Sequence, residues 1–151
     1  MNSVNFYHLK NSNTYSVLSK LIEKALEQEE QILIRTGSST ATNEIDEFLW
    51  SYDLSSFLPH SILGDQESTF NSIHISNEFD NPNNAQFFFV INTGNVNSGE
   101  ILRFKRSFIL FNDDDLDILE FSQKLWMELK NKSVERKYWT QEDKRWVLKE
   151  S

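Results

Sequence analysis

The sequence of 151 residues contains no cysteine, only two prolines and only four glycines. Without cysteine the chain can form neither a disulfide nor a thiolate zinc site. It has no run of about 18 apolar residues, and residues 1–12 lack the apolar core of a secretory signal, so we expect a cytoplasmic protein without a membrane helix. The scarcity of proline and glycine also argues against a disordered or fibrous chain.

The composition predicts one globular domain spanning residues 1–151. Hydrophobic residues make up 38% of the chain, and 12 Phe and four Trp provide large side chains for a core. A domain of this size buries roughly 68–70% of the surface that its unfolded chain exposes.

Charge is unevenly distributed along the chain. Residues 1–120 carry 7 Lys and Arg against 18 Asp and Glu, a net charge of −11, whereas residues 121–151 carry 8 against 5, a net charge of +3. The acidic body disfavours non-specific binding to DNA or to an anionic membrane. The basic end is suited to a small acidic partner, or is simply a helix with lysines on its solvated face.

Hydrophobic periodicity predicts alternating strands and helices. We expect strands at 4–9, 31–35, 72–76, 86–92 and 103–111, and helices at 15–29, at 42–52 and after an acidic start at 112–117. An ordered loop is predicted at 57–64 and a polar loop at 94–100, and residues 134–151 are predicted to form a surface-lying arm or a second short helix. A strand, helix and strand within the first 35 residues indicate a parallel pair. The predicted fold is therefore α/β, three-layered, with helices flanking a mostly parallel sheet.

Chemical motifs that such a fold could carry are absent from the sequence. The first strand-to-helix turn, KNSNTY, has no glycine, so the phosphate-binding device of Rossmann-like folds is missing. There is neither a P-loop nor a G-x-S-x-G elbow. His8, His60 and His74 lack metal-ligand spacing, and Asp113 to Asp115 are better explained as a helix start than as a calcium loop. We expect no catalytic, cofactor-binding or metal-binding residues.

A more specific pattern runs through the first 65 residues. It consists of FYHL at 6–9, QILIRT at 31–36 and IDEFLWSYDLSSFLPHSILGD at 45–65. This pattern resembles the chi subunit family of bacterial DNA polymerase III. Members of that family begin with an F-Y-x-L strand and carry a helix ending in L-D-x-x-L-W, followed by an S-F-x-P-H loop and a glycine. Ile45 replaces the first leucine of the helix motif, and Gly64 is the final glycine.

The resemblance implies a Rossmann-like fold without a nucleotide site and a non-catalytic accessory subunit of the polymerase III clamp-loader assembly. It implies two partners, the psi subunit and the acidic, phenylalanine-terminated tail of the single-stranded-DNA-binding protein, and contact with nucleic acid only through them. Trp50 and Phe57 match aromatic positions beside the tail pocket of the family, and Lys124 and Lys132 match basic positions on its last long helix.

A receptor for such a tail needs an apolar pocket for the phenylalanine ring and cations for the carboxylates. Because Lys124 and Lys132 are eight residues apart, we expect them on roughly the same face of this helix, where both can line one groove. Glu128 and Asn131 depart from the family pattern, and Glu128 would repel an acidic tail. The psi surface is not assigned; parts of 86–92 or 103–111 are candidates, although both segments also fit a buried sheet.

Other interpretations stay open at this point. Trp50 and Phe57 could be core aromatics, and the two lysines could be ordinary solvated side chains. A degenerate nucleotide-binding enzyme is one alternative function. Direct binding of single-stranded DNA by the aromatic and basic residues near the C-terminus is another, involving Lys137, Tyr138, Trp139 and Trp146.

Overall fold

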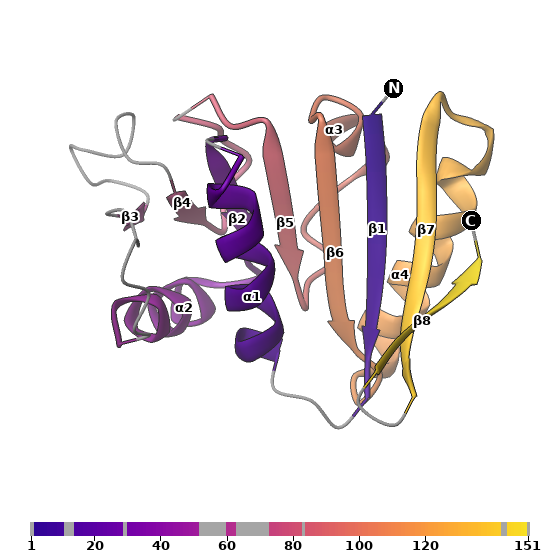
Figure 1. Cartoon of the computed structure of the whole chain (residues 1–151), viewed down its shortest axis with the longest axis horizontal. Helices are drawn as coiled ribbons and strands as arrows, with labels where there is room; N and C mark the ends of the chain where they lie inside the picture. The colour runs from indigo at the N-terminus through magenta and orange to yellow at the C-terminus, as the bar shows by residue number, and fades with distance from the viewer. Residues whose placement is uncertain are drawn as a thin grey trace.

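The computed structural model describes residues 2–10, 14–28, 30–51, 60–62, 73–82, 84–142 and 145–150. Within these ranges eight strands form one sheet in the order β3-β4-β2-β5-β6-β1-β7-β8 (Figure 1). All neighbouring strands pair in parallel except β7 and β8, which are antiparallel. The strands are β1 (Asn2–Leu9), β2 (Ile32–Arg35), β3 (His60–Ile62), β4 (Ile73–Ser76), β5 (Phe87–Ile91), β6 (Arg106–Asn112), β7 (Val134–Glu142) and β8 (Arg145–Glu150).

The helices cover both faces of this sheet. On one face lie α1 (Thr14–Leu26) and α2 (Ser39–Ser51), and on the other lie α3 (Ser98–Ile101) and α4 (Leu116–Glu128), which continues into the 3-10 turn η1 (Leu129–Asn131). Each pair packs into its own hydrophobic core against the sheet. The predicted three-layer α/β fold with a mostly parallel sheet is therefore confirmed.

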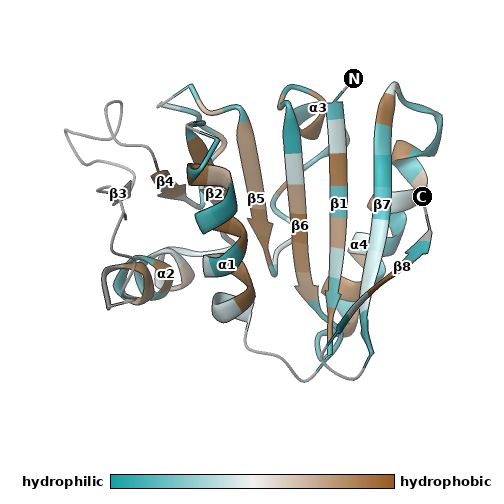
Figure 2. Cartoon of the chain, in the orientation of Figure 1, coloured by the Kyte–Doolittle hydropathy of each residue, from teal (hydrophilic) through white to brown (hydrophobic). Residues whose placement is uncertain are grey.

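Strand β5 illustrates why the sheet is buried on both sides. Phe87, Phe89 and Ile91 enter the core beneath α1 and α2, whereas Phe88 and Val90 enter the core beneath α4. All five side chains are at most 4% exposed. A parallel strand covered on both faces has no polar side to show, so its sequence is a continuous apolar run, visible as an unbroken brown strand in Figure 2.

Several predicted boundaries are corrected by the structure. Residues 134–151 contain strands β7 and β8 and not a surface arm or a short helix. The predicted loop at 94–100 ends in α3, where the Asn97 side chain caps the helix by accepting from the backbone N–H of Glu100. The strand predicted at 103–111 begins only at Arg106, because the chain is still turning out of α3 before it. In the loop predicted at 57–64, residues 60–62 form β3, and the others lie outside the described residues.

None of the helices in the described ranges is long and apolar enough to cross a membrane.

The contact between α1 and α2 allows a titration experiment. The Tyr15 hydroxyl donates a hydrogen bond to Glu44 Oε2 at 3.0 Å. Burial, this hydrogen bond and the negative charge of Glu44 together raise the pKa of Tyr15 from 10 to about 12. The pKa of Tyr15 is higher in the folded than in the unfolded chain. Its contribution to the free energy of unfolding is therefore complete below pH 10 and is lost as the pH rises through about 12.

We expect Glu44→Gln to lower the pKa of Tyr15 towards 10, without reaching it because the phenol stays partly buried. The measurement is a pH titration of phenolate absorbance, with Tyr15→Phe subtracted to isolate this side chain. An identical titration in Glu44→Gln would show that Glu44 has no part in the shift.

Candidate functional site

Of the four predicted tail-binding residues, only Lys124 and Lys132 have side chains within the described part of the chain. Trp50 is in the last turn of α2, with its side chain outside the described residues, and Phe57 lies outside them altogether. Helix α2 packs beside β3 and β4, whereas Lys124 is on α4, which packs beside β6 on the opposite face (Figure 1). Lys124 and the backbone of Trp50 are therefore separated by the sheet.

The expectation that Lys124 and Lys132 share a helix face is also wrong. Helix α4 ends at Glu128, the chain tightens into η1, and Lys132 has an extended backbone with φ −99° and ψ 159°. A spacing of eight residues brings two side chains to one face only where the helix is continuous between them. Both lysines are exposed, as are Glu128 and Asn131.

The structure instead presents a pocket between α4 and the C-terminal strands, which we call the α4–β7 pocket. Its volume is about 370 Å³. It is lined by residues from the end of β1, from α4, from β7 and from β8, namely His8, Lys10, Gln123, Trp126, Tyr138, Thr140 and Lys149. Ligand pockets in proteins commonly have volumes of roughly 300–1,000 Å³, so this pocket is large enough for a small group or a peptide end.

Helix α4 is placed over the sheet by its cap and its apolar stripe. Asp115 is the N-cap, and its side chain accepts hydrogen bonds from the backbone N–H groups of Asp117 and Ile118. The acidic start predicted from the sequence is therefore a helix start in the structure. Ser122, Leu125 and Trp126 face the sheet, and Gln123 faces the pocket.

Trp126 forms a rigid wall of the pocket. Its ring makes edge-to-face contacts with Phe6 at 5.4 Å and with Tyr138 at 5.5 Å. The guanidinium of Arg136 lies 3.9 Å from the ring centroid, and Arg136 Nη1 donates to the Trp126 carbonyl at 2.6 Å. Each of these contacts restrains the indole, so the wall is formed before any ligand arrives.

His8 links Tyr138, on the other side of the pocket, to Asp113 in the turn between β6 and α4. Its Nε2 lies 3.1 Å from Asp113 Oδ2, and its Nδ1 lies 2.9 Å from the Tyr138 hydroxyl. A carboxylate can only accept, so Nε2 carries the proton donated to Asp113. In the neutral imidazole Nδ1 then accepts from the Tyr138 hydroxyl. This chain of hydrogen bonds fixes the Tyr138 ring beside Trp126.

Polar groups in the pocket are suited to an anion. Thr140 is 2% exposed, and its hydroxyl has no hydrogen-bond partner among the described residues. Lys10 and Lys149 line the same pocket, and Lys149 Nζ also lies 3.4 Å from Oε1 of Glu142, whose side chain is exposed. Two ammonium groups, a buried hydroxyl and two aromatic walls can together receive a carboxylate attached to an apolar side chain.

Most of this pocket could not be predicted from the sequence, because residues 134–151 were expected to form a surface-lying arm or a short helix. One signal was present: Arg136, Tyr138 and Thr140 alternate along β7, and all three point to the α4 side. Lys10 and Lys149 carry no local signal, since they come from opposite ends of the chain.

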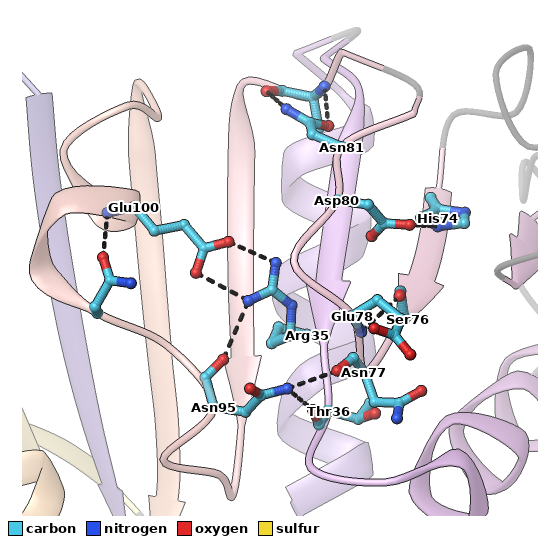
Figure 3. Close-up of polar contacts among 12 residues, drawn as sticks. Arg35, Thr36, His74, Ser76, Asn77, Glu78, Asp80, Asn81, Asn95 and Glu100 are labelled. Atoms are coloured by element: carbon cyan, nitrogen blue, oxygen red, sulfur yellow. Dashed lines mark hydrogen bonds and ion pairs between the residues drawn. The ribbon is translucent and has the colours of Figure 1, made fainter.

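A second polar cluster fills the carboxyl end of the sheet between β2 and β5 (Figure 3). Arg35 is fully buried and donates two hydrogen bonds to the Glu100 carboxylate, at 2.9 and 2.6 Å. Asn95 Nδ2 donates to the carbonyls of Thr36 and Asn77. In open α/β sheets, ligands bind where neighbouring strands send their connections to opposite faces, as β2 and β5 do here. In this chain that position holds an ion pair of the protein itself.

Among the described residues no cluster of three or more His, Asp or Glu side chains could hold a metal ion.

Comparison with known proteins assigns the chain to a family. The profile of the family described as DNA polymerase III chi subunit, HolC, matches residues 1–137. A protein of Rickettsia prowazekii (strain Madrid E) named "Probable DNA polymerase III subunit chi" is 27% identical over 111 residues. That alignment covers 74% of this chain and 66% of the rickettsial protein, just under two thirds of its length. Since the family profile matches most of the sequence, this chain belongs to the DNA polymerase III chi subunit family.

Proposed function

We propose that this chain is a non-catalytic accessory subunit of the replicative DNA polymerase III clamp-loader assembly. In this role it binds the acidic, phenylalanine-terminated tail of the single-stranded-DNA-binding protein. Family membership supports the accessory role. The observation that carries the tail-binding proposal is the α4–β7 pocket, which combines aromatic walls with two lysines.

The pocket provides what the end of such a tail requires. The terminal phenylalanine ring would lie against Trp126 and Tyr138, whose rings are already held by Arg136 and His8. The terminal carboxylate would accept hydrogen bonds from Lys149 and from the Thr140 hydroxyl, which otherwise lacks a partner. Capture of a C-terminal carboxylate with its side chain is a recurrent mode of peptide recognition.

Lys124 and Lys132 fit this proposal as outer contacts. Lys124 is exposed on α4 beside Gln123, so it can meet aspartates upstream of the terminal phenylalanine. Lys132 is exposed beyond the end of the helix. Glu128 follows Lys124 by one helical turn and is also exposed, which reduces the positive charge available to the tail. Trp50 belongs to the opposite face of the sheet, and a tail held in the pocket does not need it.

Fluorescence anisotropy with a labelled acidic peptide ending in Asp-Ile-Pro-Phe tests this proposal. We expect saturable binding, no binding of a peptide that lacks the final phenylalanine, and a loss of roughly tenfold or more in affinity for Lys149→Gln. That loss corresponds to one hydrogen bond between charged groups, about 1.5–3 kcal/mol. Lys20→Gln is the matched control, because Lys20 is an exposed lysine of α1 on the other face.

Two further variants in the same assay locate the tail. Lys124→Ala should weaken binding and flatten its dependence on salt, whereas Trp50→Ala should leave it unchanged. If Trp50→Ala abolishes binding and Lys149→Gln does not, the tail binds on the α2 face and the pocket assignment is wrong.

The psi subunit is the second proposed partner, and it would connect this chain to the clamp loader. This part of the proposal rests on membership of the chi family alone. Co-expression with a psi subunit followed by size-exclusion chromatography tests it: a stable heterodimer is expected, and separate elution of the two chains would count against it.

A further inference from the structure

One half of the sheet has a face that no described helix covers. Helix α2 packs beside β3 and β4 and α1 reaches as far as β6, and Figure 1 shows no helix over β1 and β7 on that side. The opposite face of the same strands is covered by α4. Helices usually cover both faces of a parallel sheet, so a sheet face that is open to solvent is unusual in an α/β protein. The side chains on such a face are candidates for a binding surface.

The strand registers define which side chains share this open face. Tyr7 of β1 is opposite Trp139 of β7, which in turn is opposite Leu148 of β8. Two residues earlier along β1, Asn5 is opposite Lys137, and Ser3 lies between Arg106 and Glu135. Alternate residues of a strand point to the same side, so these rows lie on one surface. On this surface the aromatic side chains lie beside the carboxyl half of β1, and the cationic side chains lie beside its amino half.

The aromatic rings are fixed and partly exposed. Trp139 donates its indole N–H to Asn5 Oδ1 at 3.0 Å, and Trp146 contacts Tyr7 edge to face with ring centroids 5.1 Å apart. Tyr7, Trp139 and Trp146 each keep part of their surface in solvent. Burial raises the pKa of Tyr7, with nearby Arg106 lowering it in part, so the phenol stays uncharged at neutral pH.

The cations lie beside these rings in a shallow hollow. Arg106 and Lys137 line a hollow of about 110 Å³ together with Ser3, Val4, Asn5 and Glu135. Glu135 is 3.7 Å from Lys137, but both side chains are at least 42% exposed, so solvent screens this pair. The hollow therefore offers two cations and several hydrogen-bonding groups to an anion.

We propose that this open face is a binding site for single-stranded nucleic acid, with bases stacking on Tyr7 and Trp139 and phosphates held by Arg106 and Lys137. Open sheet faces with aromatic rings on neighbouring strands, edged by basic side chains, are a common platform for single strands. A protein partner fits less well. Of the side chains in these rows only Leu148 is an exposed aliphatic group, and serine, asparagine and charged residues interrupt the rings.

The acidic body of the protein sets the expected strength of this contact. With a net charge of −8, the chain repels a polyanion, and only the local cations offset that repulsion. Binding should therefore be weak and strongly dependent on salt. The contact would act mainly when the protein is already held close to a strand, where the effective concentration is high.

Anisotropy of a labelled oligothymidylate of roughly 20 nucleotides at low salt tests the proposal. We expect saturable binding by the full chain. Lys137→Gln should weaken it and reduce the slope of log K against log salt by about 0.7, the value for one phosphate contact on a single strand. Trp139→Leu should weaken binding by roughly fivefold or more, the effect of losing one stacked base.

Lys149→Gln is the matched control, because its lysine lies in the α4–β7 pocket on the opposite face. It should bind the oligonucleotide normally, and Lys137→Gln should bind the tail peptide normally. Thermal unfolding followed by circular dichroism verifies that each variant is folded, and Lys137→Gln carries the test if Trp139→Leu is unfolded.

Three results would overturn the proposal. The first is that the full chain does not bind the oligonucleotide at low salt, and the second is that all folded variants bind it equally. The third is that, with no affinity of the full chain for the oligonucleotide, variants on this face lose binding to a protein partner, which would make the face a protein interface.

Discussion

Glu100→Gln is expected to destabilise the protein by roughly 3–5 kcal/mol, because it leaves the cation of Arg35 buried without its counterion. The side chain of Arg35 is 0% exposed and that of Glu100 is 13% exposed, with 2.6 Å between the closest charged atoms. Glutamine keeps the shape of glutamate and can still accept one hydrogen bond. The loss therefore reports the missing charge and not a cavity.

Urea unfolding followed by circular dichroism measures this effect. The double variant Arg35→Met, Glu100→Met should recover much of the lost stability, because neither charge is then buried. Lys105→Gln is the surface control: Lys105 is 59% exposed and lies 3.3 Å from Glu30, so its loss should cost at most about 1 kcal/mol. Equal losses in Glu100→Gln and Lys105→Gln would show that the Arg35 pair behaves like a solvated one.

Trp126→Ala should destabilise the protein by a similar amount, roughly 3–5 kcal/mol. The indole is 5% exposed and contacts Phe6, Tyr138 and Arg136. Removing it leaves a cavity between α4 and the sheet and withdraws the aromatic surface from Arg136. The α4–β7 pocket would lose one wall in the same step, so affinity for the tail peptide should fall together with stability.

Trp126→Phe separates these two consequences. Phenylalanine restores much of the buried volume, so we expect a smaller loss of stability in urea unfolding. Circular dichroism is the appropriate signal, since the substitution removes a fluorophore. If Trp126→Ala unfolds at the same urea concentration as the unmodified chain, α4 is not held to the sheet by this residue.

The parts of the fold that could be predicted are those whose signal is local. The apolar run of β5 predicted a buried strand, and the helical spacing of Leu18, Ile22 and Ala25 predicted α1. In both elements the buried side chains are apolar, so the pattern of burial can be read from the order of apolar residues in the sequence. The family assignment came from short motifs near the N-terminus, and the family profile confirms it.

The parts that could not be predicted depend on residues far apart in sequence. Strand β7 is only half buried, so its polar residues indicated a surface arm. It forms a strand because it pairs with the edge of β1, which lies more than 100 residues earlier in the sequence. The partner of Arg35 is 65 residues away, in a segment predicted as a loop. Lys132 was misplaced for a local reason, since no proline or glycine marks the end of α4 at Glu128.

The position of β1 in the sheet has a consequence for how the chain acquires its structure during synthesis. Strand β1 is synthesised before both of its partners, since it pairs on one side with β6 and on the other with β7, residues 106–112 and 134–142. One edge of β1 therefore stays unpaired until β6 has been made, and the other until β7 has been made. Such long-range pairing is slow, and an unpaired apolar strand is prone to aggregate in the meantime. We therefore expect a nascent chain to benefit from chaperone protection of β1 until β6 and β7 have been made.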